Sequence, residues 1–415
     1  MKKKIVSILL IAVMAVAGLT ACGAPEGGQS QQQNSGSVQA EEGSDDGAAQ
    51  TAGGVNMISE DLMGSAPAEG ADFSDMKIGE IEYNTLDDGG WSQATHEGVL
   101  AAMNELGIPE ENLIALDGIE EEPAQVQEAA QQLIDQGCSL IISASTGYAG
   151  FLEEVAAANP DVKIAQWDST KHANLMGYEI RSYEGMFLAG YACELMSQDE
   201  NTKLGFCASW NEFSVRTAIN AYALGAQYAN PEATVQVACA DSWYDPDKEK
   251  QCALTLMSPD PQNDNKGIKY MAMEASSPAI PETCEENGAY VVGYHIDMSS
   301  LAPDAVPVSF TWNFAPIFKQ MMISVNDGTA TADDFYYWGG ECSKLTDFAS
   351  FVPDEVKAQV EELKGKLASG EVNVYSGPLN DNKGNVLVNE GEVMDDNTII
   401  LQEFFVEGVD CAWEI

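Results

Sequence analysis

Side chains suited to acid–base or nucleophilic catalysis are scarce in this sequence. It contains three histidines, His96, His172 and His295, which fall on three separate predicted elements. A Ser-His or Cys-His device needs a histidine held beside its nucleophile, and none of the three has a recognisable partner nearby in the sequence. Phosphate-binding loops, the GxSxG elbow and the HExxH motif do not occur. We therefore expect a protein that binds a molecule without catalysing a reaction, and that needs no cofactor.

The nine cysteines do not form a metal-binding pattern. No CxxC pair occurs, so a zinc site is not expected. Several cysteines lie in apolar strand or helix patterns, where a buried free thiol behaves as a small hydrophobic residue. Disulfides remain an alternative, and their connectivity stays open.

Aromatic and polar residues follow several predicted strands. Asn84 and Asp88 lie in the loop after the first strand, and Trp91 begins the helix that follows it. Trp243 follows a later strand in the same way. The other candidates near strand ends are Ser145, Trp167, Trp210 and His295. Each has a structural alternative. Ser145 could cap a helix, the tryptophans could fill the core or an interface, and His295 could be a neutral histidine behind the binding site.

Alternating strand and helix patterns occur twice along the chain. The first series has strands at 77–83, 112–116, 139–143, 162–166 and 175–181, and helices at 91–106, 126–134 and 151–158. The second has strands at 203–208, 234–240, 267–273 and 290–295, and helices at 214–227, 247–257 and 279–287. These patterns predict an α/β fold of two doubly wound parallel-sheet lobes. Ligands of such sheets bind outside the carboxyl ends of the strands.

The amino-terminal region is typical of an exported lipoprotein. Lys2, Lys3 and Lys4 precede an apolar run at 5–19, which is too short for a permanent membrane span. Small residues then precede Cys22, which we expect to carry a lipid anchor after removal of a signal peptide at 1–21. Residues 22–75 are rich in Gly, Gln, Ser and acidic residues, and predict a disordered tether.

The formal net charge of the chain is −47. Such an acidic surface repels nucleic acid and anionic lipid, and it favours solubility of an exported domain. Nucleic acid is therefore not an expected partner.

Five segments in order resemble motifs of the basic membrane protein family, which is close to the purine nucleoside receptor lipoproteins. They are Asp88-Gly89-Gly90-Trp91, Glu97-Gly98, the segment 183–190 (YEGMFLAG), the segment 241–249 (DSWYDPDKE) and the segment 293–299 (GYHIDMS). The resemblance covers residues 76 to about 407. It implies a type I periplasmic-binding fold, with a ligand cleft between two lobes, and a substrate-binding protein of an ABC importer.

By this resemblance, Trp91 and Trp243 sandwich a purine nucleoside or nucleobase, and Asp297 accepts hydrogen bonds from it. Two π faces with a few directional acceptors suit a flat heterocycle. The implied partners are the ABC permease and ATPase subunits, and the implied location is extracytoplasmic, lipid-anchored to the cell membrane. We expect a monomer. The alternatives are a receptor for a sugar or sugar-like signal, a sensory surface lipoprotein and a surface hydrolase.

The expected domain boundaries follow from the two series. Lobe 1 spans 76–180 with part of about 312–327, and lobe 2 spans 181–311 with part of about 328–415. We expect chain crossings near 181, 295–311 and 327–340, and cleft closure by hinge motion.

Overall fold

The computed structural model describes residues 56–167, 173–197 and 203–415. The expected signal peptide, Cys22, most of the expected tether and His172 lie outside these residues. In the part of the chain that the structure describes, no helix combines the length and the apolar character needed to cross a membrane.

Lobe 1 is built on a seven-stranded sheet in which every neighbouring pair is parallel. In spatial order its strands are β1 (Asn56–Ile58), β12 (Asp334–Trp338), β6 (Met176–Ile180), β5 (Lys163–Trp167), β4 (Leu140–Ser143), β2 (Ile78–Ile81) and β3 (Leu113–Leu116). The apolar run of β4 is buried along its whole length, as a central parallel strand requires.

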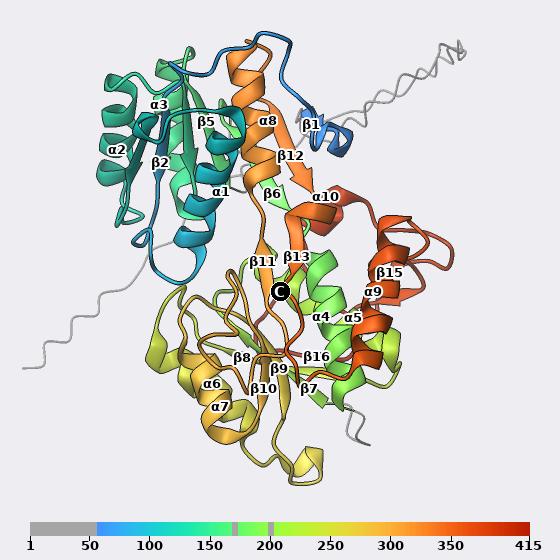
Figure 1. The fold of residues 1–415 in the computed structure, drawn as a ribbon. Helices are drawn as coiled ribbons and strands as arrows, with labels where there is room; N and C mark the ends of the chain where they lie inside the picture. Colours follow the sequence, from blue (N-terminus) through green and yellow to red (C-terminus); the bar gives the residue numbers. More distant parts are fainter. Residues whose placement is uncertain (1–55, 168–172, 198–202) are drawn as a thin grey trace, which may run out of the picture. The chain divides into compact units, whose positions relative to one another are not determined.

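Helices cover both faces of this sheet (Figure 1). They are α1 (Trp91–Leu106) and α8 (Ala315–Asn326) on one face, and α2 (Pro123–Asp135) and α3 (Ala149–Ala158) on the other. The strand residues divide between the two cores by alternation, so Leu140 and Ile142 join the α1–α8 side while Ile141 joins the α2–α3 side.

Lobe 2 is built on a five-stranded sheet that is also parallel throughout. Its strands in spatial order are β10 (Tyr290–Val292), β9 (Tyr270–Glu274), β7 (Lys203–Ala208), β8 (Thr234–Cys239) and β16 (Val409–Asp410). Its helices are α4 (Ser182–Ser197), α5 (Phe213–Ala229), α6 (Pro246–Met257) and α7 (Ala279–Asn287). Together the two sheets confirm the predicted α/β class.

Two glycines allow α4 and α5 to pack closely against each other. A Cβ atom at Gly190 of α4 would lie 2.0 Å from the backbone oxygen of Tyr222, and one at Gly225 of α5 would lie 1.9 Å from that of Phe187. Any larger residue would force the two helices apart, so Gly190, in one of the quoted motifs, has a structural reason to be glycine.

The remaining elements are short or lie in the carboxyl-terminal region. They are β11 (Phe310–Trp312) and β13 (Ser343–Leu345), which pair antiparallel, the helices α9 (Asp354–Ala368) and α10 (Asp396–Ile400), and the hairpin of β14 (Leu379–Asn380) and β15 (Val386–Val388). Short 3-10 turns are η1 (Glu60–Leu62), η2 (Glu110–Asn112), η3 (Thr146–Tyr148), η4 (Pro261–Asn263) and η5 (Gly340–Cys342).

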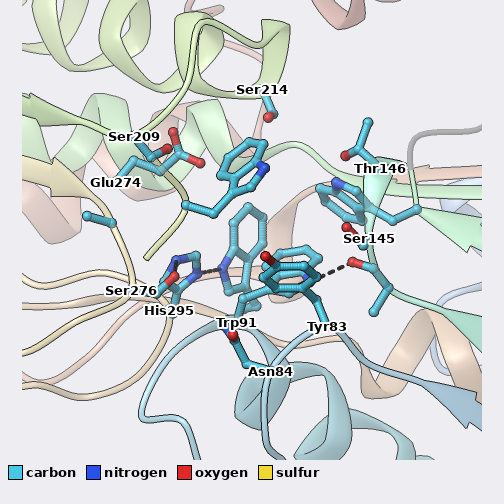
Figure 2. A pocket seen from close by; sticks show the side chains of 15 residues that line it. Tyr83, Asn84, Trp91, Ser145, Thr146, Ser209, Ser214, Glu274, Ser276 and His295 are labelled. Atoms are coloured by element: carbon cyan, nitrogen blue, oxygen red, sulfur yellow. Dashed lines mark hydrogen bonds between the residues drawn. The ribbon is translucent and has the colours of Figure 1, made fainter. Parts of the chain in front are cut away.

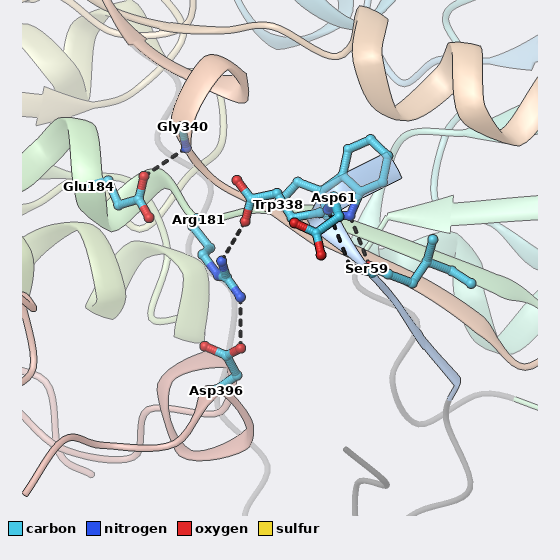
Figure 3. Close-up of polar contacts among 9 residues, drawn as sticks. Ser59, Asp61, Arg181, Glu184, Trp338, Gly340 and Asp396 are labelled. Carbon is cyan, nitrogen blue, oxygen red and sulfur yellow. Dashed lines mark hydrogen bonds and ion pairs between the residues drawn. The ribbon is translucent and has the colours of Figure 1, made fainter. Parts of the chain in front are cut away.

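The chain passes between the two sheets three times: between β6 and α4, between β10 and α8, and between β12 and β13. At the first crossing, Arg181 donates to Glu60 Oε2 at 2.7 Å and to Asp396 Oδ2 at 2.8 Å (Figure 3). Beside it, Glu184 accepts a hydrogen bond from the backbone of Gly340 at the third crossing. One arginine therefore joins the amino-terminal segment, a crossing and the carboxyl-terminal segment.

One expected boundary needs correction. The tether was expected to extend through residue 75, but β1 pairs with β12, and Phe73 is buried in the core of lobe 1. β1 is a short segment within the mostly polar stretch 22–75, and its partner β12 lies far along the chain. Neither feature gives a local signal for a strand. Residues 334–338 lie in the first sheet, so the part of 328–415 expected in lobe 2 does not include them.

Candidate ligand-binding site

A cavity of about 690 Å³, part of it open to solvent, lies where the carboxyl ends of both sheets meet the crossing segments. Its lining is rich in aromatic rings and small polar groups (Figure 2): Tyr83, Asn84, Trp91, Ala144, Ser145, Thr146, Trp167, Ser209, Ser214, Trp243, Glu274, Ala275, Ser276, His295 and Trp312. Both lobes contribute, as a hinged clamp requires.

The lobe 1 wall is aromatic and already hydrogen-bonded. The ring of Trp91 lies edge-on to Trp167 at 4.7 Å and to Trp312 at 5.4 Å between centroids. Its indole N–H donates to the carbonyl of Ala144 at 2.7 Å. Trp91 thus lines the cavity and also supports the hydrophobic core of lobe 1, which combines the two roles that the sequence left open.

The lobe 2 wall carries two buried oxygen atoms that stand out by their hydrogen bonding. Glu274 closes β9 and Ser209 follows β7, and Figure 2 shows them next to each other. Among the described residues, neither Glu274 Oε2 nor Ser209 Oγ has a hydrogen-bond partner. Burial raises the pKa of Glu274 well above its usual range, and the charge of Glu212 adds to the rise. The neutral carboxyl form is therefore favoured.

Trp243 supplies the aromatic surface of lobe 2. It lies in the loop between β8 and α6, where it is half-buried. Asp245 fixes the end of this loop because its carboxylate accepts from the backbone of Lys248 and caps α6, which begins at Pro246.

His295 and Trp312 come from the second crossing. Trp312 Nε1 donates to His295 Nδ1 at 2.9 Å, so the neutral ring carries its proton on Nε2, which lies 3.3 Å from the hydroxyl of Ser276. Burial lowers the pKa of His295 to about 3. His295 is therefore uncharged, and its two hydrogen bonds link Trp312 of the crossing to Ser276 of lobe 2.

Six of the predicted site residues line the cavity: Trp91, Trp243, Asn84, His295, Trp167 and Ser145. The structure brings them together from five separate segments of the chain, since Asn84 and Trp91 both belong to the connection from β2 to α1. Asn84 also donates to Asp88 at 3.1 Å, and this contact ties the loop to the start of α1.

Three predicted contacts lie outside the cavity, and each has a local reason. Asp88 accepts from the backbone of Gly90 and Gln93, so its carboxylate caps the start of α1. Asp297 is exposed and accepts from the backbone of Ser299 within its own turn. Trp210 is 41% exposed on the surface.

Several lining residues were not predicted. Ser209 and Glu274 follow or close strands, so the rule that ligands collect at the carboxyl ends of strands could have found them. Tyr83 and Ser214 had been assigned only to a strand and a helix. Trp312 enters from an antiparallel crossing strand, for which the sequence pattern carried no signal.

Residues 76–339 match the sequence model of the Bmp family, which is described as ABC transporter substrate-binding protein, PnrA-like. The chain belongs to the basic membrane protein family. The resemblance noted in the motifs is thus confirmed, and the family consists of substrate-binding proteins of ABC transporters.

Similar proteins and solved structures extend this result. A purine-binding protein from Brucella abortus is 30% identical over 352 residues, which are 84% of this chain and 96% of that protein. A Haloferax volcanii protein, provisionally named an ABC transporter glucose-binding protein, is 27% identical over 359 residues, covering 84% of this chain and 83% of that protein. A solute-binding protein structure from Conexibacter woesei has a TM-score of 0.57 at 18% identity, covering 72% of this chain and 98% of that one, and supports the fold.

Proposed function

We propose that this member of the basic membrane protein family captures a purine nucleobase or nucleoside in the cavity between its lobes, for delivery to an ABC importer. The observation that carries the proposal is the pairing of an aromatic wall with Glu274 Oε2 and Ser209 Oγ, which are buried and lack a hydrogen-bond partner among the described residues. A cavity of this kind rewards a ligand that is flat and also carries hydrogen-bonding groups along its edge.

Recognition of the ring edge falls to lobe 2. A neutral Glu274 carboxyl donates through its O–H and accepts through its carbonyl oxygen. Adjacent donor and acceptor atoms on a purine edge match that pair. The hydroxyls of Ser209 and Ser276 stand beside it on the same wall.

Stacking falls to the tryptophans, with Trp91 from lobe 1 and Trp243 from lobe 2 taking the two faces of the ring. Asn84, Ser145, Trp167 and His295 complete the site that we propose. The name of the Brucella abortus protein supports a purine ligand, since that protein matches this chain over most of its length.

The proposed mechanism is closure about the three crossings. A ligand that touches both lobes favours the closed state by its differential affinity for that state. Addition of the correct ligand should reduce the radius of gyration measured by small-angle scattering. An unchanged radius with a ligand that binds would reject the clamp.

Delivery requires partners at the membrane. We propose that Cys22 is lipidated and that the protein works on the outer face of the cytoplasmic membrane with a permease and an ATPase. Metabolic labelling with a fatty acid should mark the wild-type protein and not Cys22→Ala. Equal labelling of both would refute the anchor.

Calorimetric titration with adenine, adenosine and guanosine tests the ligand class. At least one should bind, and Glu274→Gln should change the ranking among them because the amide presents fixed donor and acceptor atoms. Glu282→Gln, at the start of α7 and outside the cavity lining, serves as the matched control. If none of the three binds to the wild type, the purine proposal fails.

A sugar is the second candidate. The name of the Haloferax volcanii relative favours it, and aromatic walls with carboxyl and hydroxyl groups also suit a pyranose. Glucose in the same titration, and ultraviolet absorbance of any ligand that co-purifies, separate the two classes, because only the purine absorbs strongly.

A further inference from the structure

The end of the chain is held against the strand that leads to Trp243. β16 runs parallel to β8, with Val409 opposite Val235 and Asp410 opposite Gln236. Two residues beyond the cysteine that follows β16, Trp413 Nε1 donates to Asp241 Oδ1 at 3.2 Å. The tail therefore contacts both β8 and the first turn of the loop that carries Trp243.

Two cysteines meet at this junction. Cys239 is the last residue of β8, and Cys411 follows β16 directly. The pairing of β8 with β16 and the bond from Trp413 to Asp241 lie on either side of the two cysteines and hold their segments together, and both residues are half-buried. The other six cysteines in the described part of the chain are buried. The pair is thus distinguished by proximity and by access to solvent.

We propose that Cys239 and Cys411 form a reversible disulfide that fastens the carboxyl-terminal tail to the root of the Trp243 loop. These contacts hold the two residues at the ends of neighbouring strands, and a disulfide requires this kind of proximity. The bond itself depends only on this geometry. Its effect on ligand binding rests on the function proposed above.

The two thiols are unequal. Their interaction with each other lowers the pKa of the Cys411 thiol and raises that of the Cys239 thiol. Cys411 is therefore the first nucleophile, since the thiolate is the reactive form.

The oxidant that the proposal requires is a disulfide, either of a small thiol or of a thiol oxidoreductase. The Cys411 thiolate attacks one sulfur of that disulfide, forms a mixed disulfide and releases one thiolate. Cys239 then loses its proton to water and attacks the sulfur of Cys411, which releases the second thiolate. The two protein thiols lose two protons and two electrons, and the oxidant takes up both electrons as its disulfide becomes two thiols.

The consequence for the site follows from the position of Trp243, four residues after Cys239 in the sequence. Asp241, between them, has a left-handed backbone with φ of 48° and accepts the bond from Trp413. A covalent link at Cys239 would fix one side of this turn. The oxidised protein should hold Trp243 in place before the ligand arrives, which reduces the entropy lost on binding.

The test uses the purified full chain, oxidised by glutathione disulfide without denaturant. The wild type should lose two hydrogens by intact mass, and a non-reducing digest should yield one linked pair of peptides containing Cys239 and Cys411. Cys411→Ser should lose no hydrogens. Cys252→Ala, which removes a buried thiol on α6 and leaves the pair intact, should still lose two.

Thermal unfolding gives an independent readout. Oxidation should raise the melting temperature of the wild type and of Cys252→Ala by about 5 °C or more, because the bond closes a long loop of the unfolded chain. Addition of a reductant should reverse the rise. Cys239→Ser and Cys411→Ser should show no such shift.

The proposal is overturned if the wild type takes up two glutathiones, links a different pair of cysteines or remains fully reduced under these conditions. Purine titration of the same reduced sample keeps the two proposals apart. Failure to bind purine would reject the ligand class and leave the disulfide standing, whereas failure to form the bond would not affect the ligand class.

Discussion

The two walls of the cavity differ in how far their polar groups are satisfied. On lobe 1, the indole of Trp91 and the amide of Asn84 already donate to protein oxygens. On lobe 2, Glu274 Oε2 and Ser209 Oγ are buried and have no hydrogen-bond partner within the part of the chain that the structure describes. A wall with satisfied polar groups offers shape and stacking to any flat ligand, whereas unsatisfied buried groups discriminate by the hydrogen bonds that a ligand supplies. Lobe 1 should therefore set the shape of the ligand, and lobe 2 its chemical identity.

The largest effect that this comparison predicts is on stability. Trp91→Ala should lower the free energy of unfolding of the ligand-free protein by about 3 kcal/mol, because it removes a ring packed against Trp167, Trp312 and Phe314. Urea unfolding followed by circular dichroism measures it. A loss below 1 kcal/mol would show that the lobe 1 wall is no more structural than that of lobe 2.

Trp243→Ala should act on binding instead. Stacking on an aromatic side chain contributes roughly 1–3 kcal/mol per base, so the affinity for the preferred purine should fall about tenfold to a hundredfold. The unfolding free energy should change much less than in Trp91→Ala, which serves as the comparison variant. Unchanged affinity in calorimetry would remove Trp243 from the site.

His96 and His295 extend the comparison to the pH dependence of stability. His96 of lobe 1 hydrogen-bonds to Glu80 at 2.8 Å, and this bond raises its pKa, whereas burial lowers the pKa of His295 to about 3. Protonation of His96 therefore stabilises the fold at low pH, and this stability is lost as the pH rises through its folded pKa. For His295 the unfolded state binds the proton more readily, so stability is lost as the pH falls below about 6.5.

His295→Gln should consequently flatten the acid side of the stability profile. Between pH 7 and pH 5, the wild type should lose about 2 kcal/mol more than this variant, given a folded pKa of about 3. His96→Gln should instead lose the stability that wild-type His96 contributes at pH 5. Parallel profiles for the wild type and His295→Gln in urea unfolding would contradict the buried neutral state.

The smallest effect should come from Ser209→Ala. Without ligand, the change removes a buried unpartnered hydroxyl, so stability should stay the same or rise slightly. With ligand, the loss of one hydrogen bond should reduce the affinity by about 1 kcal/mol, or roughly fivefold. Reduced stability without ligand would mean that the hydroxyl is needed by the fold itself.

The sequence by itself determined the elements and their arrangement into two parallel sheets. Residues 139–143 illustrate why, since a short continuous apolar run is the local signature of a central parallel strand and appears as β4. The family motifs added Trp91 and Trp243, both of which line the cavity. The ends of strands could therefore be located from local pattern, and with them the region of the site.

Only the tertiary structure decided which side chains at those ends face the cavity. Asp297 and Glu274 both lie near the ends of lobe 2 strands, yet Asp297 is exposed and bonds within its own turn while Glu274 is buried in the lining. β1 is held by β12, more than two hundred residues further along the chain. Trp312 is placed by the pairing of its own strand, β11, with β13. Burial and side-chain direction depend on such distant partners, which local pattern does not encode.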